Sequence, residues 1–158
     1  MAPIFSSHAD PALESLLPES VSGTAMHRYS LTLTQVLDNG GDRVGITAFL
    51  QSIGKTEADG SFASAFDPTS SLGGGINAFK VAGADAAALL AGITALELSD
   101  LGTGATSEQA TVGNKSVTVV SVGDGVNDTA WIYGHGDVVF VVHAPDDMKA
   151  AAYLEVLP

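Results

Sequence analysis

Residues 129–144 read TAWIYGHGDVVFVVHA and hold the strongest hairpin pattern in the chain. Residues 131–133 and 138–142 are two runs of β-prone side chains, and the two glycines between them tolerate the positive φ of a tight turn over residues 134–137. The second run is apolar at every position, whereas a half-exposed strand alternates. We therefore expect a central strand with both faces covered, around which the rest of the chain is arranged.

Other segments follow the two periods of regular structure. Alternating side chains predict a half-buried strand over residues 26–34, and residues 19–25 before it are expected to be a linker. Apolar residues three and four apart predict a helix over residues 42–53 and a second one that begins after Asp85. Short helices are expected after Asp10-Pro11 and after Asp146. Further strands are expected at residues 61–66, 76–81, 106–112 and 115–122, with a polar turn at residues 123–128.

These elements predict an α+β two-layer sandwich, with a mostly antiparallel sheet of about seven strands and helices on one face. Strands that arrive in hairpins disfavour a Rossmann-like fold. Residues 77–90 and 140–154 share an order of strand, small-residue turn, Asp and Ala-rich helix, which suggests an internal β-β-α repeat, although the segments are short enough to agree by chance. We expect an N-terminal segment with a short helix over residues 1–25 and a single domain over residues 26–158.

Composition excludes several classes of function. The chain has 18 acidic residues against 6 Lys and Arg, a net charge of −12, which repels nucleic acid and favours solubility. No apolar run approaches the ~20 residues of a membrane-spanning helix. Cysteine is absent, which excludes disulfides, thiolate metal sites and a Cys nucleophile. Residues 124–128 lack the ligand ladder of a calcium loop, and the glycine-rich stretches lack a phosphate-loop pattern, so we expect no metal and no cofactor.

The layout resembles that of uncharacterised extracytoplasmic α+β domains in actinobacterial-type lipoproteins. The resemblance rests on Leu16-Leu17-Pro18, on residues 112–117 and 136–140, and on the final Leu157-Pro158. It implies export to the cell envelope and implies no activity. The resemblance therefore predicts an extracytoplasmic or secreted location. The lipid-attachment cysteine and the leader of those proteins are not in this sequence, which makes a cytoplasmic location the alternative.

Histidines beside carboxylates are the candidates for catalysis. His135 with Asp137, and His143 with Asp146, are residue types that serve as general acids and bases, and Asp67 is a further possible partner. The sequence favours a structural role for both: a turn residue for His135, and a hydrogen bond to the start of the following helix for His143. A small hydrolase would need at least two of these groups within hydrogen-bond reach in one cleft.

Two aromatic pairs are the candidates for binding. Trp131 and Tyr133 are two residues apart and should share a sheet face, as should Phe62 and Phe66. An uncovered face would make them a patch for a ligand or partner, whereas a covered face would make them core.

The interpretation that the sequence favours is a non-catalytic binding or interaction module of the cell envelope, which takes a small apolar ligand or a protein partner. The alternatives are the small hydrolase and a subunit that associates with copies of itself. The sequence does not fix the oligomeric state.

Overall fold

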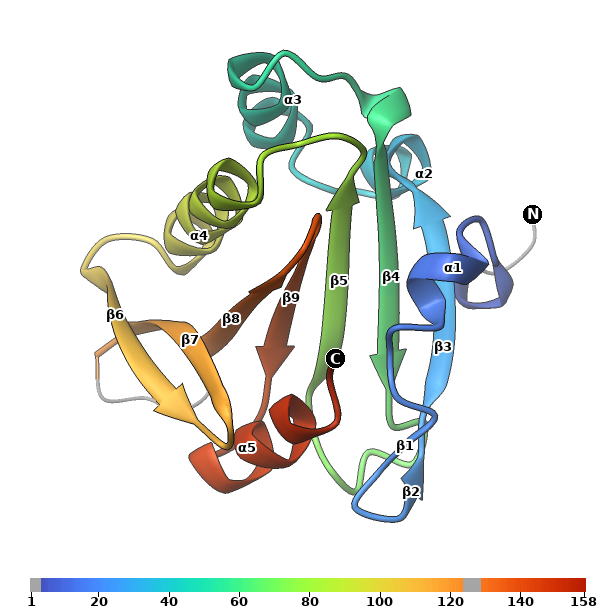
Figure 1. Ribbon diagram of the computed structural model, residues 1–158, viewed down its shortest axis with the longest axis vertical. Coiled ribbons are helices and arrows are strands. Elements are labelled where there is room, and N and C mark those ends of the chain that lie inside the picture. Colours follow the sequence, from blue (N-terminus) through green and yellow to red (C-terminus); the bar gives the residue numbers. More distant parts are fainter. Residues whose placement is uncertain (1–3, 124–128) are drawn as a thin grey trace.

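The computed structural model describes residues 4–123 and 129–158, and its centre is an antiparallel sheet of seven strands in the order β3-β4-β5-β9-β8-β7-β6 (Figure 1). The strands are β3 (His27–Thr32), β4 (Gly60–Phe66), β5 (Gly75–Val81), β6 (Ala105–Val112), β7 (Lys115–Val122), β8 (Thr129–His135) and β9 (Val138–His143). The predicted α+β class and the seven antiparallel strands are confirmed. The expected polar turn falls largely on residues 124–128, which lie outside the described residues.

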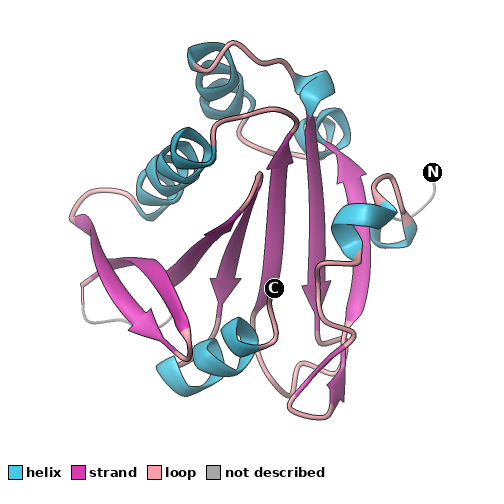
Figure 2. Cartoon of the chain, in the orientation of Figure 1, coloured by secondary structure: helices cyan, strands magenta, loops and turns pink. Residues whose placement is uncertain are grey.

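Five α-helices and a small hairpin surround this sheet in the described part of the chain (Figure 2). The helices are α1 (Pro11–Glu14), α2 (Leu33–Asp38), α3 (Arg43–Ser52), α4 (Ala86–Leu101) and α5 (Asp147–Glu155). Short 3₁₀ turns span Ile4–Ser6 and Glu57–Asp59. Strands β1 (Ser20–Val21) and β2 (Thr24–Ala25) form a separate two-stranded sheet where a linker was predicted. None of the described helices is both long and apolar enough to cross a membrane.

Helices cover both faces of the sheet, not one as predicted. Alternate residues of β9 divide between two cores: Val138, Phe140 and Val142 pack with α5 and α1, whereas Val139 and Val141 pack with α4. Figure 1 shows α1 and α5 in front of the sheet. The all-apolar β9 is therefore buried on both sides, as its composition indicated.

The two β-β-α units do not repeat in space. Helix α4 follows β5 and packs in one core, whereas α5 follows β9 and packs in the other. Because β5 and β9 are antiparallel neighbours, a two-fold axis normal to the sheet would put both helices on the same face. The likeness between the two segments is therefore one of local pattern.

The N-terminal segment belongs to the same core as the strands. Leu13, Leu17 and Val21 are each at most 2 % exposed and pack with Trp131 and Tyr153 in the core beneath α5. Asp10 begins α1 as predicted, because its Oδ1 accepts from the Leu13 N–H at 2.9 Å.

The opposite face has a gap in its helical cover. Helix α2 packs on β3 and β4, and α4 packs on β6 to β9, so β5 lies between the two areas. Helix α3 packs against α4 and bridges this gap. The space left beneath α3 forms the apolar pocket described in the next subsection.

Candidate binding pocket

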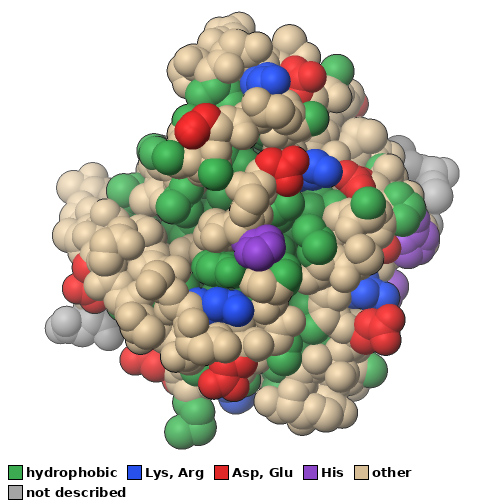
Figure 3. Space-filling model, in the orientation of Figure 1, with side chains coloured by type: hydrophobic (Ala, Val, Ile, Leu, Met, Phe, Trp, Pro, Cys, Tyr) green, Lys and Arg blue, Asp and Glu red, His purple; other side chains and the backbone are tan. Residues whose placement is uncertain are grey.

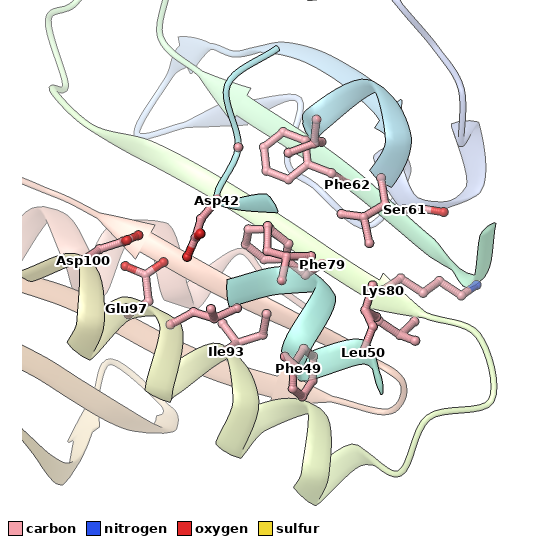
Figure 4. Close-up of a pocket in the computed structure, with 16 residues that line it drawn as sticks. Asp42, Phe49, Leu50, Ser61, Phe62, Phe79, Lys80, Ile93, Glu97 and Asp100 are labelled. Carbon is pink, nitrogen blue, oxygen red and sulfur yellow. The ribbon is translucent and has the colours of Figure 1, made fainter. Parts of the chain in front are cut away.

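An apolar pocket of about 200 Å³ lies between the sheet and helices α2, α3 and α4. Its floor is made by Phe62 of β4 and Phe79 of β5, which are direct cross-strand partners with ring centroids 5.2 Å apart in an edge arrangement. The remaining lining residues come from helices α2, α3 and α4, from the loop between α2 and α3, and from further positions on β4 and β5 (Figure 4). The apolar members of the wall are Leu33, Val36, Ile46, Phe49, Leu50, Val81, Ile93 and Leu96.

A glycine allows α3 to approach α4 beside this pocket. A Cβ at Gly92 of α4 would collide with the ring of Phe49. The missing side chain lets that ring pack directly against the helix backbone, where it forms part of the wall. Gly92 therefore sets the spacing of the two helices that close the pocket.

Three carboxylates stand together at one end of the pocket. Asp42 precedes α3, and Glu97 and Asp100 lie on the last turns of α4; Figure 4 shows all three on the same side of the cavity. Asp42 also begins α3, since its Oδ1 accepts from the Gly45 N–H at 3.0 Å. We call this group the acidic mouth. Lys80 lies at the opposite end and points away, with its Nζ 3.9 Å from Asp137.

A second hollow of about 410 Å³ adjoins the pocket and is more open to solvent. It shares Phe79, Glu97 and Asp100 with the pocket and is also lined by His143. Burial lowers the pKa of His143. Glu97 and Asp100 therefore stand at the junction of two connected hollows.

Burial, together with the nearby charge of Asp100, raises the pKa of Glu97 to about 7. The folded protein then holds a proton that the unfolded chain releases above pH 4.5, the ordinary value. The contribution of the protonated Glu97 to the free energy of unfolding is fully present below pH 4.5. It is lost as the pH rises from there through about 7.

We therefore expect Glu97→Gln to raise the free energy of unfolding above that of the natural chain at pH 8, and to do so more than it does at pH 4.5. The full shift would correspond to ~3 kcal/mol, and partial exposure of the carboxyl reduces the expected gain to about 1–2 kcal/mol. Urea unfolding of both proteins at the two pH values measures it. Glu155→Gln, an exposed glutamate on α5, is the control and should show no such gain. An equal effect of Glu97→Gln at both pH values would contradict the raised pKa.

The structure does not bring the two candidate histidines together. His135 pairs with Val138 beside the two-residue turn of the β8–β9 hairpin, so it lies in strand β8 and not in the turn as predicted. His143 is at the other end of β9. The Tyr133 hydroxyl lies 3.5 Å from Nδ1 of His135.

The three candidate aspartates have structural partners. Asp137 faces Lys80, and Asp146 accepts from the Lys149 N–H at 2.8 Å as the start of α5. Asp67, only 5 % exposed, accepts from the backbone and hydroxyl of Thr69, from the Ser71 hydroxyl and from the Leu72 N–H. These hydrogen bonds hold the pKa of Asp67 well below its usual range. Each carboxylate thus organises a turn, a helix start or an ion pair.

The four aromatic candidates lie in four different environments. Trp131 is 1 % exposed in the core, so its ring offers no surface to a ligand. Tyr133 is half-buried; its hydroxyl donates to the Pro158 carbonyl at 2.8 Å and its ring lies under Lys115. Figure 3, which views the α1 and α5 side, shows charged side chains spread around that face and not gathered into one patch.

Phe62 and Phe66 lie on the opposite sheet face from Trp131. Phe62 forms the pocket floor. Phe66 packs farther along β4 with Phe5 and Tyr29. Of the predicted binding residues, only Phe62 lies at the pocket.

Among the described residues, no group of three His, Asp or Glu side chains is arranged to hold a metal ion. Comparison with protein-family models, with curated proteins and with solved structures gave no match. The geometry of the pocket is therefore the main guide to function.

Proposed function

We propose that this protein binds a small apolar molecule, or the apolar part of a larger one, in the pocket between β4, β5 and helices α2 to α4. The observation that carries the proposal is a hollow with an aromatic and aliphatic lining around Phe62, Phe79 and Phe49, beside cores that are otherwise packed. Concave apolar sites with a few polar groups at one end are the usual form of small-molecule sites.

The volume sets the size of the occupant. An engineered apolar cavity of about 150 Å³ takes up benzene. A pocket of about 200 Å³ therefore has room for one ring with a short tail. A buried ring removes roughly 150 Å² of apolar surface from water, which corresponds to a Kd on the order of 1 mM for such a fragment.

Binding of 2-phenylethanol, followed by methyl NMR, tests the proposal. We expect saturable shifts in the methyl resonances of Ile46, Ile93 and Leu96, which line the pocket from two helices. Valine methyls of the other core, such as Val117, should not move. No saturable shift up to ~10 mM, a tenfold excess over the expected Kd, would overturn the proposal. So would shifts centred elsewhere.

Action in the cell envelope is part of the same proposal. Its support is the resemblance to extracytoplasmic domains carried by Leu16-Leu17-Pro18 and Leu157-Pro158. Release of the protein from intact host cells by osmotic shock or surface protease would support this location. Recovery in the cytosolic fraction alone would overturn it and leave the binding proposal untouched.

A further inference from the structure

We propose that the pocket takes an amphiphilic cation, an ammonium compound whose apolar end fills the cavity and whose charge rests at the acidic mouth of Asp42, Glu97 and Asp100. The inference rests on the proposed function, since it assigns a ligand class to the same cavity. The site is the cavity, and the carboxylates select what enters it.

The apolar wall and the acidic mouth are continuous. Leu96 and Glu97 are neighbours on α4, and both line the pocket together with Ile93 one turn earlier. Phe79 belongs to both the pocket and the adjoining hollow, beside Glu97. A molecule with one ring and a charge two or three bonds away can therefore reach the carboxylates while its ring stays on the aromatic floor.

The protein's own cations near the pocket are engaged elsewhere. Arg43, next to Asp42 in sequence, is bound to Asp38 at 2.7 Å and to Glu57 at 3.0 Å. Lys80 is at the far end, against Asp137. Within residues 4–123 and 129–158, no Lys or Arg forms an ion pair with a carboxylate of the acidic mouth. The mouth thus carries negative charge that attracts a cation and repels an anion.

Cation binding should be coupled to one proton. Glu97 is partly protonated near neutral pH because burial and Asp100 raise its pKa to about 7, and a cation beside it favours the ionised form. Binding should then release a proton and strengthen between pH 6 and pH 8. The other titratable groups around the pocket and hollow are Asp42, Asp100, His143 and Lys80. Burial lowers the pKa of His143, so this side chain carries less positive charge at pH 6 than an ordinary histidine.

Three compounds of matched shape separate this inference from the proposed function. They are 2-phenylethylammonium, the neutral 2-phenylethanol and the anionic 3-phenylpropionate, each titrated into the full chain at pH 8. We expect the ammonium compound to bind about tenfold more tightly than the alcohol, and the anion to bind most weakly. Equal binding of ammonium and alcohol overturns the inference and leaves the apolar pocket standing. Binding of none of the three overturns both.

Glu97→Gln locates the effect. The variant should reduce the preference for the ammonium compound over 2-phenylethanol to about threefold or less, and it should remove the strengthening between pH 6 and pH 8. Glu155→Gln removes the same charge from the opposite face of the molecule and should leave the preference unchanged. An equal loss of preference in both variants would mean that net charge, not the acidic mouth, selects the cation, and would overturn the assignment.

Discussion

Trp131→Ala should lower the free energy of unfolding by about 3–5 kcal/mol. The indole is 1 % exposed on β8, between the cross-strand partners Val119 and Val142, and packs in the core beneath α5. Removing it leaves a cavity that a sheet hydrogen-bonded on both sides closes only in part. Urea unfolding followed by circular dichroism measures the loss, since the chain has no other tryptophan to report by fluorescence.

Val44→Ala is the matched control for this loss. Val44 is 83 % exposed on α3, so its truncation should change the free energy of unfolding by no more than about 0.5 kcal/mol. A cost below ~1 kcal/mol for Trp131→Ala would contradict the buried placement of the indole. It would also restore Trp131 as a candidate for a surface site.

Ile46→Trp should abolish binding of 2-phenylethanol, raising its Kd at least tenfold. Ile46 lies on α3 and faces the pocket, so an indole at this position takes the space that the ligand ring would need. The substitution places more apolar surface in an existing hollow, and we expect the urea midpoint to stay equal or to rise. The same titration by methyl NMR measures the binding.

Val44→Trp adds the same side chain to the outer side of the same helix. Because Val44 is exposed, this variant should bind 2-phenylethanol as the natural chain does. Its added indole should also emit at longer wavelength than the indole of Ile46→Trp, which is shielded from water. Unchanged binding by a folded Ile46→Trp variant would place the ligand outside the pocket.

The strands and main helices follow from sequence because their signals are local. The turn residues Gly113-Asn114 and the apolar stripe through Leu89 and Ile93 predict the β6–β7 hairpin and α4 within a few residues. The all-apolar run at residues 138–142 also predicted cover on both faces of β9. That expectation was correct. The separate prediction that helices cover only one face of the sheet was wrong, and the all-apolar run already argued against it.

Helix α2 was missed because the alternation of Tyr29, Leu31 and Leu33 continues past the end of β3. The available signal was the spacing of Thr32 and Gln35. The Thr32 side chain accepts from the Gln35 backbone, and the Gln35 side chain accepts from the Thr32 backbone, which is a capping box. Leu33, read as a strand residue, instead lines the pocket from α2.

The pocket itself has no local signal. Phe62 could be singled out as an aromatic on a strand, but its exposure depends on which strands α2 and α4 cover. The distance between α3 and the sheet, and the contact of α3 with α4 at Gly92, depend on how distant segments pack together, and no local sequence pattern predicts them. Glu97 is likewise an ordinary helical glutamate in sequence, and its unusual protonation follows from burial beside Asp100.

A crystal structure with 2-(4-bromophenyl)ethanol tests most directly whether the pocket is a binding site, because bromine is located by its anomalous scattering. We predict one bromine peak in the space bounded by Phe49, Phe79 and Ile93, with the hydroxyl directed toward Glu97. A fully occupied bromine elsewhere on the protein, with this space closed or holding only water, would contradict the assignment of the pocket as the binding site.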